Sequence, residues 1–259
     1  MSGMRFLGTF IRIIYAVFLA LFISPVAIAL PLTTEDSGTL GKSRLKIELN
    51  GESSEVQTSG SKETSVTREA SIIYGLGDNL NGFVGLPHRE VSAQEADGST
   101  RFYSGYADAK FGLKWRYFEQ GGFSSGLKGT ISSPTGDAAK KLGYGRSTYG
   151  MNAISSYELE EWEVHMNLGY TLQPNSLDEL ERLVNLSAAV VYKFQGRWQM
   201  MADMGSTSSK GLNDSLGFFG LGLSYAIAKD IYAEIGWKHS ASASTDEIGR
   251  LARLAVKFY

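Results

Sequence analysis

One ten-residue stretch, "WEVHMNLGYT" from Trp162 to Thr171, alternates between apolar and polar side chains without a break. Alternation with a period of two is typical of a β-strand whose two faces meet different surroundings. In a soluble sandwich the apolar face would point into a protein core. In a membrane barrel it would contact lipid, with aromatic residues such as Trp162 and Tyr170 at the two interfaces. The rest of the chain has to distinguish these two classes of fold.

The same alternation recurs along the chain, with connections of two kinds between the alternating segments. Tight connections such as Gly77-Asp78 and Lys229-Asp230 alternate with longer polar ones such as "QPNSLDELE" and "STSSKGLND". Outer-membrane barrels have short periplasmic turns and long external loops. The sequence therefore predicts an all-β chain that forms an antiparallel up-and-down transmembrane β-barrel, with twelve strands favoured and ten or fourteen left open. The predicted strands cover residues 43–57, 63–76, 79–88, 107–118, 122–133, 147–157, 160–172, 182–193, 196–207, 214–227, 230–241 and 247–259.

Aromatic residues give an independent test of this fold. If both termini are periplasmic, the aromatic residues of the apolar faces gather at the periplasmic ends of the strands, and a sparser set lies at the opposite ends. Amphipathic rings are favoured at membrane–water interfaces, so the pattern predicts two girdles around a lipid-facing surface. The expected periplasmic girdle is Tyr74, Trp115, Tyr117, Phe123, Tyr157, Trp162, Tyr192, Trp198, Tyr225 and Phe258, and the opposite one is Tyr149, Tyr170, Phe219 and Trp237.

The N-terminal residues have the organisation of a signal peptide. Arg5 and Arg12 precede a short apolar stretch over residues 13–23, and Ala27-Ile28-Ala29 forms a small-residue cleavage site. An uncleaved anchor is the alternative. We expect residues 1–29 to be a cleaved signal peptide, residues 30–42 a short periplasmic segment and residues 43–259 the barrel, exported to the outer membrane of a Gram-negative cell.

Composition excludes several classes of function. The chain has 259 residues, no cysteine and a formal net charge of −2, so it lacks cysteine metal sites, disulfides and the basic surplus of a nucleic-acid binder. No cofactor and no metal are predicted. The expected partners are outer-membrane lipid and lipopolysaccharide, the barrel-assembly machinery, which reads a C-terminal strand ending in aromatic residues such as Phe258, and a small solute of unknown identity.

Charged residues fall on the polar faces of the strands, where they point into the lumen. Their density cannot face lipid, because Lys or Arg near the midplane costs roughly 2–4 kcal/mol. The basic residues Lys110, Lys114, Arg116 and Lys128 of neighbouring strands form a short ladder, and Asp108 offsets only one of them. The wall is therefore expected to be net positive and to favour anions in a narrow pore. The alternative is a lumen plugged by ion pairs in a structural or adhesive barrel. The candidate lining residues are Lys110, Lys114, Arg116, Lys128, Asp108, Glu163, His165, Asp203, Glu234, Lys238, Arg253 and Lys257.

Two other features of the sequence raise alternatives to a pore, an enzyme site and a phosphate-binding loop. An outer-membrane enzyme that attacks acyl esters needs a serine and a histidine on one face, but His239 and Ser240 are adjacent and point to opposite faces, and His165 has no serine beside it in sequence. A pair formed across strands stays open, and no catalytic residues are predicted. The loop "SPTGDAAKKLGYG" lacks the order of a phosphate-binding loop. With Lys140 and Lys141 it can fold into the mouth, contact lipopolysaccharide phosphates or remain an ordinary solvated loop.

Three fragments of the chain resemble a known family. They are "SIIYGLGDNLNGFVGLP" at 71–87, "DAKFGLKWR" at 108–116 and "SSPTGDAAKKLGYG" at 132–145, with "NLGYTL" at 167–172 as a weaker fourth. They are similar to outer-membrane proteins grouped as the putative MetA-pathway of phenol degradation. The resemblance implies a membrane barrel and the passage of small compounds, with aromatic compounds among the candidates. It implies no catalytic residues.

Overall fold

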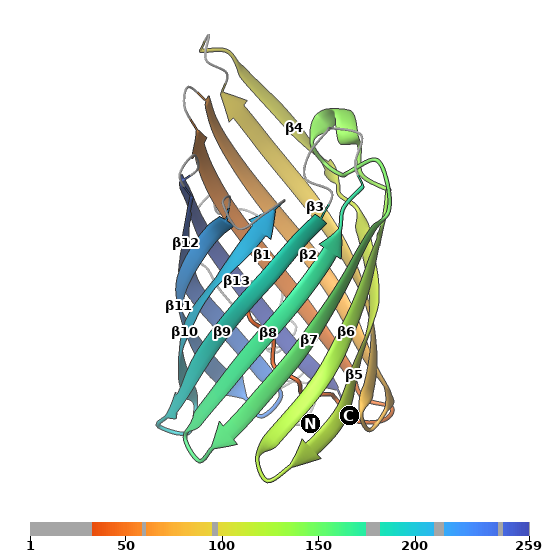
Figure 1. Ribbon diagram of the computed structural model, residues 1–259, viewed down its shortest axis with the longest axis vertical. Helices are drawn as coiled ribbons and strands as arrows, with labels where there is room; N and C mark the ends of the chain where they lie inside the picture. Colours follow the sequence, from red (N-terminus) through yellow and green to blue (C-terminus); the bar gives the residue numbers. More distant parts are fainter. Residues whose placement is uncertain are drawn as a thin grey trace, which may run out of the picture.

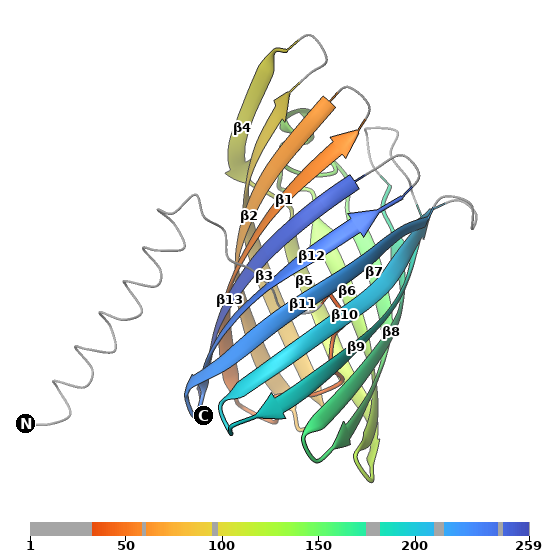
Figure 2. The ribbon, with the colours of Figure 1, turned by 90° about the vertical axis from the view of Figure 1, so that its left-hand side faces the viewer.

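In the computed structural model, the chain forms one continuous antiparallel sheet that closes on itself (Figures 1 and 2). The structure describes residues 33–58, 61–94, 98–174, 182–209, 215–242 and 246–258. The strands of these residues are β1 (Leu45–Thr58), β2 (Ser61–Gly77), β3 (Leu80–Gln94), β4 (Thr100–Tyr106), β5 (Ala109–Gln120), β6 (Phe123–Ser133), β7 (Thr148–Leu159), β8 (Trp162–Leu172), β9 (Arg182–Phe194), β10 (Trp198–Ser209), β11 (Ser215–Ala228), β12 (Ile231–Ala241) and β13 (Asp246–Phe258).

Except for β4 and β5, strands that are neighbours in the sequence pair in space around the sheet, and the first strand pairs with the last. Leu45 at the start of β1 lies opposite Phe258 at the end of β13, so the chain enters and leaves the barrel at the same end. Both β4 and β5 pair with β3, so the thirteen strands of the described residues make a barrel wall of twelve. This confirms the predicted fold and strand number.

The interruption between β4 and β5 lies opposite a proline. β4 pairs with the outer half of β3 up to His88, β5 pairs with the inner half from Gly85, and Pro87 lies between them. A proline has no N–H to donate to a sheet ladder. Between β4 and β5, the backbone N–H of Ala107 donates a hydrogen bond to the carbonyl of Pro87 on β3, at 2.9 Å. Residues 100–106 lie outside the strands that the sequence predicts. In the structure they form a strand that projects with β3 above the rest of the barrel (Figure 2).

The connections at the two ends of the barrel differ in length, as predicted. At the end where β1 begins, two residues join most hairpins, as in Gly121-Gly122 between β5 and β6. Both glycines have positive φ, 58° and 82°, and a two-residue hairpin turn of this type requires that conformation. The opposite end carries the longer connections, including residues 134–147 with a short 3₁₀ turn, Ala138–Lys140.

The outward face of the barrel is apolar between two rows of aromatic residues. Trp162 is 48% exposed and Tyr170 is 43% exposed, although both are large aromatic side chains on β8, which is paired on both sides. Rings of neighbouring strands contact one another at the predicted periplasmic level, with centroids 4.5 Å apart for Trp162–Tyr192 and for Trp198–Tyr225. The aromatic residues predicted for both girdles therefore lie on the outward face.

The predicted signal peptide, residues 1–29, lies outside the described residues. Among the described residues, no helix has the length and apolarity needed to cross a membrane.

Candidate functional site in the barrel lumen

The first described residues lie inside the barrel and are held by its inner wall. Asp203 of β10 accepts hydrogen bonds from the backbone N–H groups of Thr33 and Thr34, and from the Thr34 hydroxyl. The Asp203 side chain is buried together with Thr34. The sequence analysis expected residues 30–42 to be a short periplasmic segment. The structure instead places residues 33–41, called the lumen segment below, across the interior of the barrel.

Further along, side chains of four other strands hold the lumen segment. The Asn167 amide of β8 is bonded to both the N–H and the carbonyl of Glu35, each at 2.8 Å. Ser156 of β7 accepts the N–H of Ser37 at 2.9 Å, and Ser37 also contacts Ser124 of β6 through its hydroxyl. Nearer the strand β1, Asn81 of β3 accepts the N–H of Leu40 at 3.1 Å.

A tight bend connects the lumen segment to β1. Gly41 has φ of 85° and Ser43 has φ of 62°, so the chain turns through left-handed conformations there. The bend is bonded to β2, because the N–H of Ser43 donates to the carbonyl of Gly75 at 2.8 Å. A Cβ atom at Gly75 would lie 1.8 Å from the carbonyl oxygen of Gly41, so only glycine allows this approach.

Each cation of the predicted basic ladder has an acidic partner. Lys110 pairs with Glu69 of β2 at 2.6 Å, and Arg116 pairs with Glu119 at 2.9 Å. The other two pair with the lumen segment: Lys114 with Asp36 at 3.3 Å and Lys128 with Glu35. The expectation that only one of these cations would be offset, leaving a net-positive wall, is therefore wrong. Two of the carboxylates come from β2 and from the end of β5, and the other two come from the lumen segment, which the pattern of the strands does not reveal.

Asp108 has a different place from the one predicted. Its carboxylate is buried and accepts the N–H groups of Gly136 and Tyr144, both at 2.9 Å, so it fixes the loop 134–147 at the barrel mouth. In the same loop Lys141 pairs with Glu63 of β2 at 2.7 Å. The Lys140 ammonium bonds to Asp137 at 2.9 Å and holds the pKa of that carboxyl below its usual value. Leu142 of the loop is buried beside Gly105 of β4, so the loop packs against β4 and, through Lys141, against β2.

The remaining predicted residues of the lumen also have partners. On one arc Glu163 pairs with Lys193 and lies 3.5 Å from His165. On the other arc Arg253 bridges Glu234 at 3.4 Å and Glu48 at 3.9 Å. Two lysines lie over inward-facing rings, Lys238 over Phe218 at 5.9 Å and Lys257 over Tyr232 at 5.3 Å.

A serine and a histidine from neighbouring strands contact each other, a pairing that the sequence alone leaves open. Ser156 Oγ lies 2.9 Å from His165 Nδ1, and Glu163 lies on the far side of the imidazole. A hydrolase needs such a serine to be open to its substrate. Here Ser156 is 5% exposed and its hydroxyl already accepts the N–H of Ser37. This arrangement therefore supports the lumen segment, and it offers no room for an acyl group at the serine. Among the described residues, no group of three or more His, Cys, Asp or Glu side chains could hold a metal ion.

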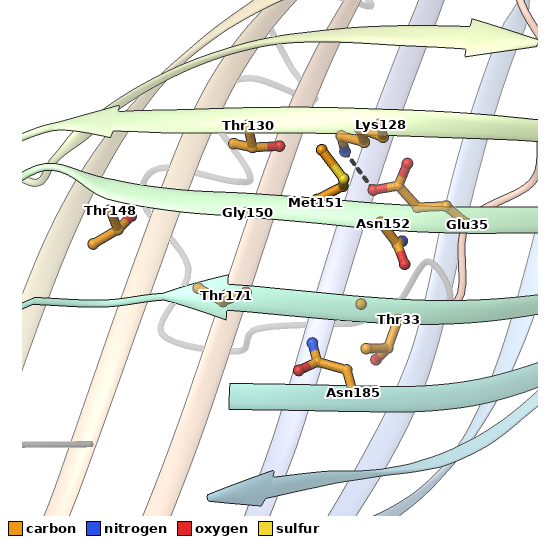
Figure 3. Close-up of a pocket in the computed structure, with 11 residues that line it drawn as sticks. Thr33, Glu35, Lys128, Thr130, Thr148, Gly150, Met151, Asn152, Thr171 and Asn185 are labelled. Atoms are coloured by element: carbon orange, nitrogen blue, oxygen red, sulfur yellow. Dashed lines mark hydrogen bonds and ion pairs between the residues drawn. The ribbon is translucent and has the colours of Figure 1, made fainter. Parts of the chain in front are cut away.

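Beside the lumen segment lies a polar chamber of about 270 Å³ (Figure 3). Its wall comes from β6 to β9, and Thr33 and Glu35 of the lumen segment complete it. The Lys128–Glu35 ion pair lies at one side, and threonine and asparagine side chains point into the space. The lining residues are Thr33, Glu35, Lys128, Thr130, Thr148, Gly150, Met151, Asn152, Gly169, Thr171 and Asn185.

Sequence reasoning identified Lys128 among these lining residues and missed the others. Uncharged inward residues such as Thr130 and Asn185 carry no signal beyond the alternation of their strands. The lumen segment had one usable signal. Its sequence, "TTEDSGTLG", has Leu40 as its only large apolar residue and contains two adjacent acids, while Lys114 and Lys128 have no acidic residue close to them on their own strands.

Residues 37–258 match the family model described as "Putative MetA-pathway of phenol degradation". The chain belongs to this family. No match was found among curated protein sequences.

Solved structures with a similar fold are outer-membrane barrels of more than one function. An outer membrane channel from Pseudomonas putida F1 is 15% identical, with a TM-score of 0.69 over 91% of this chain and 99% of that one. The β domain of the Bordetella autotransporter BrkA is 13% identical, with a TM-score of 0.58 over 84% and 100%. The toluene transporter TbuX of Ralstonia pickettii is 9% identical, with a TM-score of 0.50 over 92% of each chain. At these identities the likeness shows the fold alone.

Proposed function

We propose that this protein is a narrow outer-membrane pore for small organic solutes, in which the lumen segment sets the bore. The observation that carries the proposal is the placement of residues 33–41 across the lumen beside an open polar chamber. A twelve-stranded barrel lies between the ~8-stranded barrels that side chains can fill and the ~16-stranded ones that leave an aqueous channel. One extended segment inside it therefore leaves a passage for small molecules only.

The family and the similar structures support transport rather than catalysis. The family is named for phenol degradation, and one similar structure is a channel and another a toluene transporter. The proposal includes export by cleavage after Ala29, residence in the outer membrane of a Gram-negative cell and both ends of the barrel sequence on the periplasmic side. Lipopolysaccharide and the barrel-assembly machinery are the expected partners there.

The ion pairs favour a second candidate, a plugged barrel that conducts nothing. Lys114 and Lys128 are both paired with the lumen segment. The backbone of the segment is bonded to four strands, and the Ser37 hydroxyl contacts a fifth. Single-channel conductance of the refolded protein distinguishes the two candidates. A pore narrowed by the segment gives small, regular current steps, whereas a plugged barrel gives none at any voltage below the breakdown of the bilayer.

A pair of double variants tests the role of the lumen segment. Gly75→Ala/Asp203→Ala disturbs the bend at one end and removes the anchor at the other, so the conductance should rise severalfold. Gly77→Ala/Glu234→Gln is the matched control, because a Cβ at Gly77 meets nothing closer than 3.8 Å and Glu234 contacts Arg253 and Ser224 instead of the segment. Heat-modifiable gel mobility checks that both variants form barrels. Equal conductance of the two would contradict a bore set by the segment.

A further inference from the structure

The chamber has an unusual supply of uncharged hydrogen-bonding groups. In the described part of the chain, the side chains of Thr130, Thr171 and Asn185 form no hydrogen bond to another residue, although all three line the chamber. Together they offer two hydroxyls and one amide, and each of these groups can both donate and accept. They come from β6, β8 and β9, with β7 between β6 and β8, so they lie along one arc of the barrel wall (Figure 3).

The chamber has no unmatched charge. Its one cation, Lys128, is paired with its one anion, Glu35, and the Lys128 ammonium also lies 4.7 Å from the ring centre of Phe83. An ionic solute would therefore lose its hydration shell without gaining a partner of opposite charge, and this desolvation costs free energy. The lining residues of the chamber include no aromatic ring. A plain hydrocarbon in the chamber would leave the polar groups without hydrogen-bond partners, so it would bind less favourably than the water it displaces.

Two glycines keep the space open. Gly150 of β7 and Gly169 of β8 face the chamber, and a Cβ at Gly150 would meet nothing closer than 3.8 Å. The backbone does not need glycine at Gly150 for a close approach, so its effect is to leave volume in the lumen. A volume of about 270 Å³ lies just below the usual range of ligand sites, about 300 to 1,000 Å³, and it suits one small molecule.

We propose that this chamber is a binding site for a small uncharged solute that carries several hydroxyl groups, such as a cyclic polyol. The inference rests on the proposed pore function and specifies the solute that the pore prefers. Neighbouring hydroxyls of the solute bond to Thr130, Thr171 and Asn185 in place of water. A phenol, with a single hydroxyl, bonds to at most two of these three groups and binds more weakly.

The test measures the block of ion current by added solute. With myo-inositol in the bath, the wild-type current should fall with a saturable concentration dependence, and phenol should block at least tenfold more weakly. Thr171→Val/Asn185→Leu removes two of the three hydrogen-bonding groups at nearly constant shape and should weaken the inositol block by about tenfold. Gly150→Leu fills the chamber and should abolish the block.

The control is Gly129→Leu, on the outward face of β6, where a Cβ meets nothing within 4 Å. It should leave both the current and the block as in the wild type. A wild-type current that inositol does not reduce, or that phenol reduces more strongly, would overturn the chamber as a polyol site while the pore stands. Block that is unchanged in Gly150→Leu or in the double variant would overturn it as well. Absence of any wild-type current would overturn the pore, and the inference with it.

Discussion

An arginine scan across one hairpin tests which face of the barrel meets lipid. Met166 of β8 is 55% exposed and lies midway between Trp162 and Tyr170, which mark the two aromatic levels. Those eight residues span about 26 Å along the strand at ~3.3 Å each, or about 20 Å along the membrane normal for a tilt of ~40°. Met166 therefore lies near the midplane of the apolar band.

The cost of arginine should follow depth. Met166→Arg should destabilise the folded barrel by roughly 2–4 kcal/mol, the range for Arg at the midplane, which is about a 30- to 1,000-fold change in the folding equilibrium. Leu186 of β9 is equally exposed and pairs with Leu168, two residues from the upper aromatic level at Tyr170. Leu186→Arg should therefore cost less, about 1–2 kcal/mol. Asn185→Arg, one residue away, points into the aqueous lumen and should cost still less.

Urea unfolding in lipid vesicles, followed by tryptophan fluorescence, measures these free energies, and heat-modifiable gel mobility confirms the folded state. The decisive result is the order Met166→Arg, Leu186→Arg, Asn185→Arg from the most to the least destabilised. If Asn185→Arg costs as much as Met166→Arg, the outward face does not lie in lipid and the register of β8 and β9 relative to the membrane is wrong.

Two further predictions concern processing and ion selectivity. N-terminal sequencing of membrane-extracted protein should begin at Leu30, which follows the small residues of the cleavage site, and a retained Met1 would contradict export by this signal. The paired ladder should give the wild type a reversal potential near zero in a salt gradient. Glu35→Gln/Asp36→Asn leaves Lys114 and Lys128 without acidic partners and should shift the potential toward anion preference, more at 0.1 M salt than at 1 M because screening is weaker. An unchanged potential would show that these cations do not face the ion path.

The barrel was predictable because each strand carries its own evidence. Alternation assigned the two faces residue by residue, and aromatic residues such as Trp162 and Tyr170 marked the depth. The exception, β4, is a short strand in the part of the sheet that projects above the rest of the barrel (Figure 2). It exposes Phe102 and Tyr106 with the polar Ser104 between them, which is too short an alternation to indicate a strand, and the break opposite Pro87 separates it from β5.

The lumen was predictable only in part, because a strand pattern says which side chains point inward but not what they meet. Glu119 faces the same side as Arg116 because a bulge between Arg116 and Phe118 shifts the register by one residue. The partners of Lys114 and Lys128 come from residues 78 and 93 positions away in the sequence. No periodic signal marks such contacts, since the lumen segment is neither strand nor helix.

The lumen segment explains why many inward residues are acceptors of backbone hydrogen bonds. An extended chain inside a barrel has N–H groups that need partners. The wall supplies them in order along the segment, with Asp203 for Thr33 and Thr34 and three neutral side chains farther on. Those are Asn167 for Glu35, Ser156 for Ser37 and Asn81 for Leu40. Much of the polar lining is therefore committed to a fixed peptide. A solute can bond only to the polar groups that the segment does not use. In the chamber these are hydroxyl and amide groups beside the Lys128–Glu35 ion pair.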